Sequence, residues 1–382
     1  MRRAGAVVAT MLVLFTMSAA VPLDQQGSSA WPGPEPATPI GPLGRPLPDP
    51  TPPQPVSYWE NRYVHGWDQQ HTTAYLPLSR SRDSWDHYSL AYGVDQNTAM
   101  YRATGRVRYL DRALLYVSNV VASARVSSSL AGSAYRDGYL GSATTRSGIG
   151  GEVPLYESYF WRYATTLLRV IRRTPALYDN PIYRQQYDRL LAFAEVHVFE
   201  KWHRRGPDDT IYRSRTHMTA HWAAIALNLA LVTSDAVRRA AYRAVVDDFD
   251  MDLRGQMRDN PAVPQAYFWS DKWGSTDRPG QDVGHGNGVM SYVVEAHDFG
   301  TQWTPVDMDR FGVLLTAVIW PRDRVYRRYV DGTGTDNGWF ADGFVKLGRY
   351  SVAVQRRLEH HAVVNHQFIA NMALNARLLS GS

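Results

Sequence analysis

The segment 281–300 (QDVGHGNGVMSYVVEAHDFG) contains the densest group of side chains in the sequence that could do chemistry. His285 and Asn287 alternate with glycines just after Asp282, and glycine lets a backbone approach a ligand closely. The apolar residues that follow keep helical spacing, and Asp282 is a good helix N-cap. A carboxylate, an imidazole and an amide at the start of a partly buried helix can bind a polar substrate or transfer its protons.

Two further histidines, His217 and His221, are one helical turn apart and share a face. They are interpreted either as a pair for proton transfer or sugar binding, or as one buried and one exposed histidine without function. The sequence HMTAH lacks the glutamate of a zinc-protease helix, and the loop 331–342 has Asp336 where a calcium loop needs glycine. No metal and no cofactor is therefore predicted.

Polar and aromatic residues recur just before or at the start of other predicted helices. They are Trp85, Asp86, His87, Tyr156, Glu157, Arg215, Tyr267, Trp269, Trp273 and Trp339. The tryptophans in Gly- and Asp-rich loops suit stacking on sugar rings or packing within the loops, whereas Trp161, Trp222 and Trp320 follow helical patterns that predict core positions.

Apolar periodicity predicts long helices and no strands. The predicted helices span 84–104, 107–126, 155–172, 182–202, 217–232, 236–257, 289–299, 305–319 and 355–379. They alternate between helices that are apolar nearly all round, such as 220–231, and helices with a charged face, such as 237–250. This alternation predicts an all-α domain of about five to six helical hairpins, with buried helices inside a ring of half-exposed ones.

Three segments, 87–113, 220–244 and 282–300, resemble the (α/α) toroid group of carbohydrate-active enzymes, which includes glycoside hydrolases, polysaccharide lyases and sugar epimerases. The resemblance extends from Trp85 to the C-terminus. It implies an (α/α) toroid whose substrate cleft lies where the inner helices begin. The polar helix starts described above are then expected to surround one cleft.

Two reactions on a polysaccharide compete, and β-elimination from a uronate-containing polymer is slightly favoured. That reaction needs donors to neutralise the sugar carboxylate and a His or Tyr to remove the ring proton. The residues of these types are Asn287, Arg215, His221, His285 and Tyr156. Asp282, Glu157, His217 and the aromatic residues complete the expected site.

Hydrolysis by inversion needs two carboxylates across the scissile bond. Glu157 with Asp282, or either of them with Asp86, has the required chemistry. A sugar epimerase or a non-catalytic toroid that binds glycans are the remaining alternatives, and the expected partner in every case is a polysaccharide or oligosaccharide.

The first part of the chain predicts export. Residues 1–22 have the basic start and apolar run of a signal peptide or an N-terminal membrane anchor, and residues 23–56 form a proline-rich linker before the catalytic domain, 57–382. A secreted or extracytoplasmic location is expected, with no membrane contact for the mature domain unless the anchor is retained. Cysteine is absent, so stability depends on the core. The net charge of +5 is too scattered to indicate nucleic-acid binding.

Overall fold

The fold is mostly helical, as predicted from the apolar periodicity. A computed structural model describes residues 52–146 and 150–381, so the predicted signal or anchor and most of the linker lie outside the described residues. Within the described ranges the strands have two residues each and form two antiparallel pairs. These pairs are β1 (Arg125–Val126) with β2 (Leu140–Gly141), and β3 (Arg258–Asp259) with β4 (Tyr267–Phe268).

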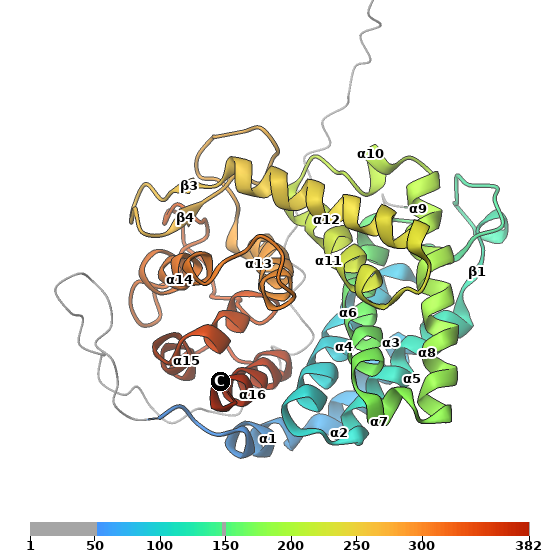
Figure 1. The fold of residues 1–382 in the computed structure, drawn as a ribbon, viewed down its shortest axis with the longest axis horizontal. Coiled ribbons are helices and arrows are strands. Elements are labelled where there is room, and N and C mark those ends of the chain that lie inside the picture. The colour runs from blue at the N-terminus through green and yellow to red at the C-terminus, as the bar shows by residue number, and fades with distance from the viewer. Residues whose placement is uncertain (1–51, 147–149, 382) are drawn as a thin grey trace, which may run out of the picture. The chain divides into compact units, whose positions relative to one another are not determined.

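Five long helices and one 3-10 helix carry most of the buried surface. They are α4 (Ser84–Thr104), α6 (Pro154–Arg173), α11 (Thr216–Val232), α13 (Val283–Asp298), η6 (Phe344–Tyr350) and α16 (His366–Ser380). Each packs against the next in this order, and α16 packs against α4 (Figure 1). The series of contacts therefore returns to the helix where it began. Burial of α11 on nearly all sides agrees with its uniformly apolar sequence.

A second set of helices covers the first, and we refer to the first set as the inner helices and to the second set as the outer helices. It comprises α5 (Val107–Ser123) on α4, α8 (Pro181–Phe193) on α6, α12 (Ala236–Gln256) on α11, α14 (Pro305–Val313) and α15 (Val352–Glu359) on η6, and α1 (Val56–Val64) on α16. Figure 1 shows α1, in blue, beside α16, in red, so the two ends of the described chain meet. Glu359, the last residue of α15, accepts a hydrogen bond from the backbone of Gln54 at 2.7 Å, so the residue stretch before α1 also contacts the C-terminal part of the chain.

Short helical segments connect these elements. They are α2 (Trp67–Gln70), η2 (His71–Tyr75), α3 (Leu76–Arg80), η3 (Ser127–Ser129), α7 (Pro175–Tyr178), η4 (Ala194–Glu200), α9 (Lys201–Arg204), α10 (Pro207–Thr210) and η5 (Leu314–Ile319). The predicted helix 182–202 is thus a run of α8, η4 and α9, in which η4 is a π-helical segment.

Two helix boundaries differ from the prediction by more than three residues, and the helix predicted to end at residue 126 ends at Ser123, because Arg125–Val126 pair with β2 as a strand. The expected single helix 355–379 is wrong, because α15 ends at Glu359 and α16 begins at His366, where the side chain of Asn365 accepts a hydrogen bond from the backbone N–H of Phe368. The helix expected from residue 289 begins at Val283, because Asp282 caps it and the glycines that follow are helical. The first boundary was missed because Asn365 was not recognised as a cap.

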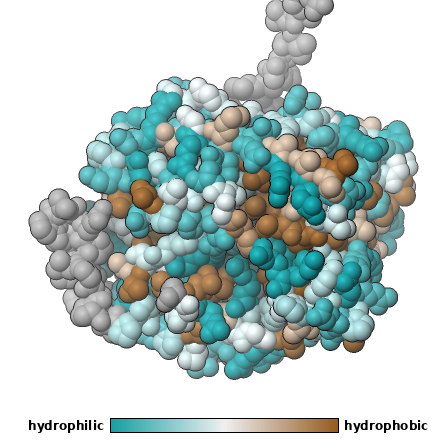
Figure 2. All heavy atoms as spheres, in the orientation of Figure 1, coloured by the Kyte–Doolittle hydropathy of each residue, from teal (hydrophilic) through white to brown (hydrophobic). Residues whose placement is uncertain are grey.

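Hydrophilic side chains cover most of the face drawn in Figure 2, and the apolar groups between them are scattered. The most exposed large apolar side chains, such as Val237 at 81% and Ile182 at 68%, belong to outer helices. None of the described helices has the length and apolar character needed to cross a bilayer.

Candidate active site

Six aromatic and imidazole rings form a continuous series of contacts across the starts of four inner helices. They are Trp85, Tyr88, Tyr159, His221, His217 and His285, and we refer to them as the ring row. The ring centroids along the row are separated by 5.2, 3.8, 5.1, 6.4 and 4.3 Å. The two ends of the row are partly exposed and its middle is buried.

Helix order explains how residues distant in sequence form this row. Its members lie in the first two turns of α4, α6, α11 and α13, which pack against one another in that order. Because the rings of adjacent helices touch near their N-terminal ends, these four helices begin on the same side of the fold. The ring row therefore joins several of the polar helix starts that the sequence singled out.

The row ends in a stacked pair of histidines whose charges differ. His217 and His285 are 4.3 Å apart with an angle of 29° between their planes. Burial of His217 and the neighbouring positive charge of His285 hold the pKa of His217 well below its ordinary value. Burial opposes protonation of His285, but its bond to Asp282 outweighs burial and raises the pKa of His285. One imidazole is therefore neutral and the other favours the protonated form.

Asp282 fixes His285 in two ways. Its carboxylate accepts the backbone N–H of His285 at 3.0 Å as the N-cap of α13, and it contacts Nδ1 of the same residue at 2.8 Å. Burial opposes ionisation of Asp282, but the bond and charge of His285 lower its pKa to about 2. The side chains of His285 and Asp282 are 44% and 28% exposed, so the pair can meet a substrate.

His221 occupies the middle of the row beside a buried arginine. Its side chain meets the ring of Tyr159 edge-on at 5.1 Å, and its Nδ1 has no hydrogen-bond partner. Burial and then the charge of Arg162 hold the pKa of His221 well below its ordinary value. Arg162 stacks on the ring of Tyr159 at 4.1 Å, while its Nε and Nη1 have no partner. Buried polar atoms without partners are uncommon, and a catalytic role is one explanation for them.

Charged groups surround the exposed end of the row. Arg215 pairs with Asp271, and the positive charge of Arg215 acts on both His217 and His285. Burial and then the negative charge of Asp282 raise the pKa of Asp336, although hydrogen bonds from the backbone partly oppose the rise.

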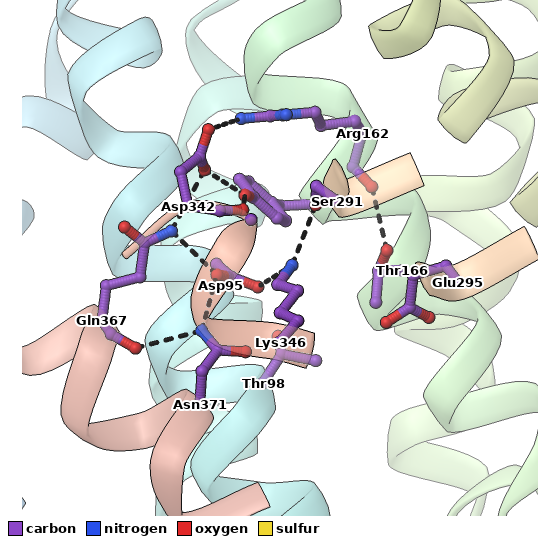
Figure 3. Close-up of polar contacts among 12 residues, drawn as sticks. Asp95, Thr98, Arg162, Thr166, Ser291, Glu295, Asp342, Lys346, Gln367 and Asn371 are labelled. Carbon is purple, nitrogen blue, oxygen red and sulfur yellow. Dashed lines mark hydrogen bonds and ion pairs between the residues drawn. The ribbon is translucent and has the colours of Figure 1, made fainter. Parts of the chain in front are cut away.

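Asp342 is a buried carboxylate that binds the ring row through Tyr159. It accepts hydrogen bonds from Tyr159 at 3.0 Å and from Arg162 at 2.5 Å, as well as from the hydroxyl of Tyr163. Figure 3 shows Arg162 reaching over Asp342, with Gln367 donating to Asp342 at 3.2 Å from the opposite side. Burial opposes ionisation of Asp342, but the charge of Arg162 and these bonds lower its pKa. This carboxylate therefore holds two members of the site in place.

A polar cavity of about 20 Å³ lies next to this anchor, between the inner helices. Lys346 donates to Ser291 at 2.9 Å and pairs with Asp95 at 3.6 Å on its wall (Figure 3). Glu295, on another side, pairs with Arg102 and Arg169. The interior of the fold therefore contains buried ion pairs as well as apolar packing.

The structure brings several of the predicted site residues together. His285, Asp282, His217, His221 and Trp85 belong to the ring row or touch it, and Arg215 lies close enough to influence it. Tyr156 meets Trp85 and Tyr88 edge-on at 5.0 and 5.7 Å. Trp339 reaches the site through Tyr92, at 6.0 Å.

Asn287 and Glu157 lie elsewhere, and each has other partners. Asn287 is fully buried, donates to the carbonyl of Trp339 at 2.8 Å and accepts the backbone N–H groups of Gly343 and Phe344, so it ties α13 to the 339–344 segment. Glu157 binds Lys201 at 2.8 Å, as well as Trp202. Neither side chain has an oxygen or nitrogen available for a substrate.

The remaining predicted residues are also used in packing. Trp269 is fully buried and meets Phe311 edge-on, because its loop folds onto α14 instead of projecting into solvent. Tyr267 donates to Asp307 at 2.5 Å, and Trp273 donates to the carbonyl of Arg213 at 2.8 Å.

Asp86 and His87 lie at the start of α4, beside Trp85. Asp86 accepts the hydroxyl of Ser81 at 2.5 Å, and His87 is buried with Nε2 3.0 Å from the carbonyl of Ser81. The predicted core tryptophans Trp161, Trp222 and Trp320 are all buried, so that prediction is confirmed.

Tyr88, Tyr159 and Arg162 were not identified from the sequence. A signal was present: Tyr88 and Tyr92 on α4, and Tyr156, Tyr159 and Tyr163 on α6, repeat at helical spacing. Of these tyrosines, only Tyr156 is among the site residues predicted from the sequence. Their number on the faces of two neighbouring helices indicated a shared aromatic surface.

Within the described ranges, no group of three or more His, Asp or Glu side chains is arranged to hold a metal ion. Comparisons of the chain with protein-family models, with curated proteins and with solved structures found no match. The chemistry of the site must therefore be argued from its own geometry.

Proposed function

We propose that the chain is an exported carbohydrate-active enzyme that cleaves a uronate-containing polysaccharide by β-elimination at the ring row. The observation that carries the proposal is the stacked pair of His217 and His285, in which one imidazole is neutral and the other is biased toward protonation by Asp282. A neutral imidazole is a competent base and a protonated imidazole is a competent acid. Their contact supplies both groups within one site.

The proposed architecture is an (α/α) toroid. Its support is the series of helix contacts that leads from α4 through α6, α11, α13, η6 and α16 back to α4, together with the outer helices on each member. The first turns of four of these inner helices contribute to the ring row. The resemblance of the sequence to toroid enzymes independently implies a substrate site at that end.

In the proposed reaction, His217 removes the ring proton next to the uronate carboxylate. The electron pair of the broken C–H bond forms a C=C bond, and the glycosidic C–O bond breaks. His285 then donates its proton to the leaving oxygen, so atoms and charge balance. Arg215 and the protonated His285 stabilise the carboxylate, whose negative charge increases as the proton leaves.

The aromatic end of the row is proposed to bind a neighbouring sugar unit. Trp85 and Tyr88 stack with an angle of 2° between their planes, and Tyr156 supports both from the side. Aromatic faces bind the C–H surfaces of sugar rings without requiring a particular pattern of hydroxyl groups. Binding at this end would hold the reacting sugar near the histidines.

The decisive test is incubation of the protein with a panel of acidic and neutral polysaccharides. We expect new reducing ends on an acidic polymer, accompanied by the ultraviolet absorbance of an unsaturated uronate. Reducing ends without that absorbance would exclude elimination. Binding without new reducing ends would instead favour a non-catalytic glycan-binding protein, and a change of sugar configuration without cleavage would favour an epimerase.

Inverting hydrolysis is a second candidate because the pKa values of Asp336 and Asp282 shift in opposite directions. The pKa of Asp336 is raised, in part by the charge of Asp282, while that of Asp282 is lowered to about 2. Such a divergence is typical of a general acid and a general base. Asp336→Asn should abolish a hydrolase and leave the proposed lyase active.

A further inference from the structure

The backbone of Gly288 lies directly against two buried groups of the site. A Cβ atom at this position would be 2.8 Å from Nε2 and 3.3 Å from Cδ2 of His221, and 3.5 Å from Nη1 of Arg162. Real Cβ atoms do not approach other heavy atoms as closely as 2.8 Å. The imidazole of His221 therefore occupies space that any side chain at residue 288 would take.

The obstruction would be hard to relieve. His221 is 3% exposed and Arg162 is 2% exposed, and the guanidinium of Arg162 is held by Asp342. A close-packed interior transmits such a displacement to its neighbours instead of absorbing it. A methyl group at residue 288 would thus move the imidazole relative to Tyr159 and His217.

Gly286 provides a matched comparison one half-turn earlier in the same helix. A Cβ atom there would lie 3.4 Å from Gln281 and 3.6 Å from Phe344, which are ordinary contact distances. Helical conformation is common to both glycines, so a substitution by alanine changes the backbone preference in the same way. Only the contact with His221 distinguishes them.

We propose that Gly288 is a positioning residue, whose missing side chain lets His221 lie beside Tyr159 and Arg162 and so holds the face of α11 that carries His217. This inference rests on the proposed function for its catalytic meaning. The packing relation itself does not depend on the reaction. Gly288 contributes no chemical group, and its effect passes entirely through His221.

The packing relation is tested by a double-mutant cycle on thermal stability. Gly288→Ala should lower Tm in the wild-type background and leave it unchanged or raise it in the His221→Ala background, where the space is free and alanine favours the helix. Gly286→Ala should have the same small effect in both backgrounds. An equal loss of Tm from Gly288→Ala in both backgrounds would overturn the inference, and the double variant provides this result even if Gly288→Ala alone does not fold.

The positioning role is tested by nuclear magnetic resonance titration of His221 and by the rate of polysaccharide cleavage. In Gly288→Ala the displaced imidazole should titrate closer to the ordinary histidine pKa, and cleavage should fall at least tenfold, while Gly286→Ala stays within twofold of wild type. An unchanged titration of His221 in a folded Gly288→Ala variant would contradict the role. If the protein cleaves no polysaccharide at all, the proposed reaction fails, whereas the stability and titration results still decide the inference.

Discussion

The ring row and a buried ionic cluster each contain a residue from the first two turns of α6, Tyr159 and Glu157, yet they differ in how their polar atoms are paired. The ionic cluster consists of Asp137, Glu152, Glu157, Lys201 and Arg205. In this cluster Glu152 accepts Ser127 and Ser133 at 3.0 and 2.9 Å, and Lys201 lies between Glu152 and Glu157. Every carboxylate of the cluster has a cationic partner.

The ring row and the adjacent Arg162 contain several buried polar atoms without a hydrogen-bond partner. Nδ1 of His217 and of His221 has no partner, and Nε and Nη1 of Arg162 have none either. An unsatisfied buried group costs about 1–3 kcal/mol, and the core tryptophans Trp222 and Trp320 have the same kind of unpaired atom at Nε1. On the proposed function, the ionic cluster stabilises the fold, and the exposed His285 end of the ring row meets the substrate.

The largest effect is expected when His217, the proposed base, is replaced by a side chain of similar volume. His217→Phe should lower polysaccharide cleavage by about 10²–10⁴-fold, because general-base catalysis contributes this much. Stability should be unchanged or increased, since an apolar ring replaces a buried imidazole whose Nδ1 is unpaired. Steady-state rates and thermal melting on the same preparation measure both. Full activity in His217→Phe would remove this residue from the reaction.

For the ionic cluster we expect the reverse, a large loss of stability with little change in the rate of cleavage. Lys201→Met leaves Glu152 and Glu157 buried without their shared cation, and breaking such a pair costs about 3–5 kcal/mol. Chemical denaturation should show this loss, while the rate per folded molecule stays near that of wild type.

A compensating change is the control for this prediction. Adding Glu157→Gln to Lys201→Met removes one of the stranded charges and should restore part of the lost stability. A fall in the rate per folded molecule, with stability unchanged, would mean that the ionic cluster belongs to the active site and that the comparison is incorrect.

The pH dependence separates the two histidines of the stacked pair. His285 has a raised pKa, so its proton is present at and below the ordinary pKa of histidine and is lost as pH rises through the raised value. His217 has a lowered pKa and stays neutral down to acidic pH. The cleavage rate should therefore fall as pH rises above neutrality, because His285 loses its proton, and should be less sensitive to a fall in pH below neutrality.

Asp282→Asn should move that alkaline limb to lower pH, because it removes the carboxylate that raises the pKa of His285. Asparagine is as good an N-cap as aspartate, so α13 should keep its start. Asp235→Asn, at the N-cap of the outer helix α12, is the matched control and should leave the pH profile unchanged. A profile of Asp282→Asn that coincides with the wild-type profile would show that His285 is not the acid.

Most of the long helices could be predicted from the sequence, and α4 matches its predicted span of 84–104, whereas η6 and the helices before residue 84 were not predicted. Apolar periodicity depends on local spacing, so it reports where helices are. Asp282, His285, His217 and His221 were expected near one another, and the structure places them in contact. Their polarity at the starts of apolar helices was sufficient for that.

What the sequence could not provide is the partner of each polar group. Glu157 and Asn287 have the right chemistry and the right position in their helices, but Lys201 and the backbone of Gly343 already satisfy them. Those partners come from segments 44 and 56 residues away. The spacing of residues along the sequence does not show which distant group will form a hydrogen bond with a given side chain.

The smallest effect is expected at the aromatic end of the ring row. Trp85→Ala should raise KM by about 2–10-fold with little change in kcat, because an aromatic contact contributes about 0.5–1.5 kcal/mol. Trp269→Phe is the contrast, since this side chain is fully buried away from the row and should lower Tm while leaving KM unchanged. If Trp85→Ala instead lowers kcat and leaves KM unchanged, Trp85 acts on the geometry of the histidines and not on sugar binding. The ring row would then be one rigid catalytic unit, because a change at its exposed aromatic end would be transmitted through Tyr88 and Tyr159 to His221.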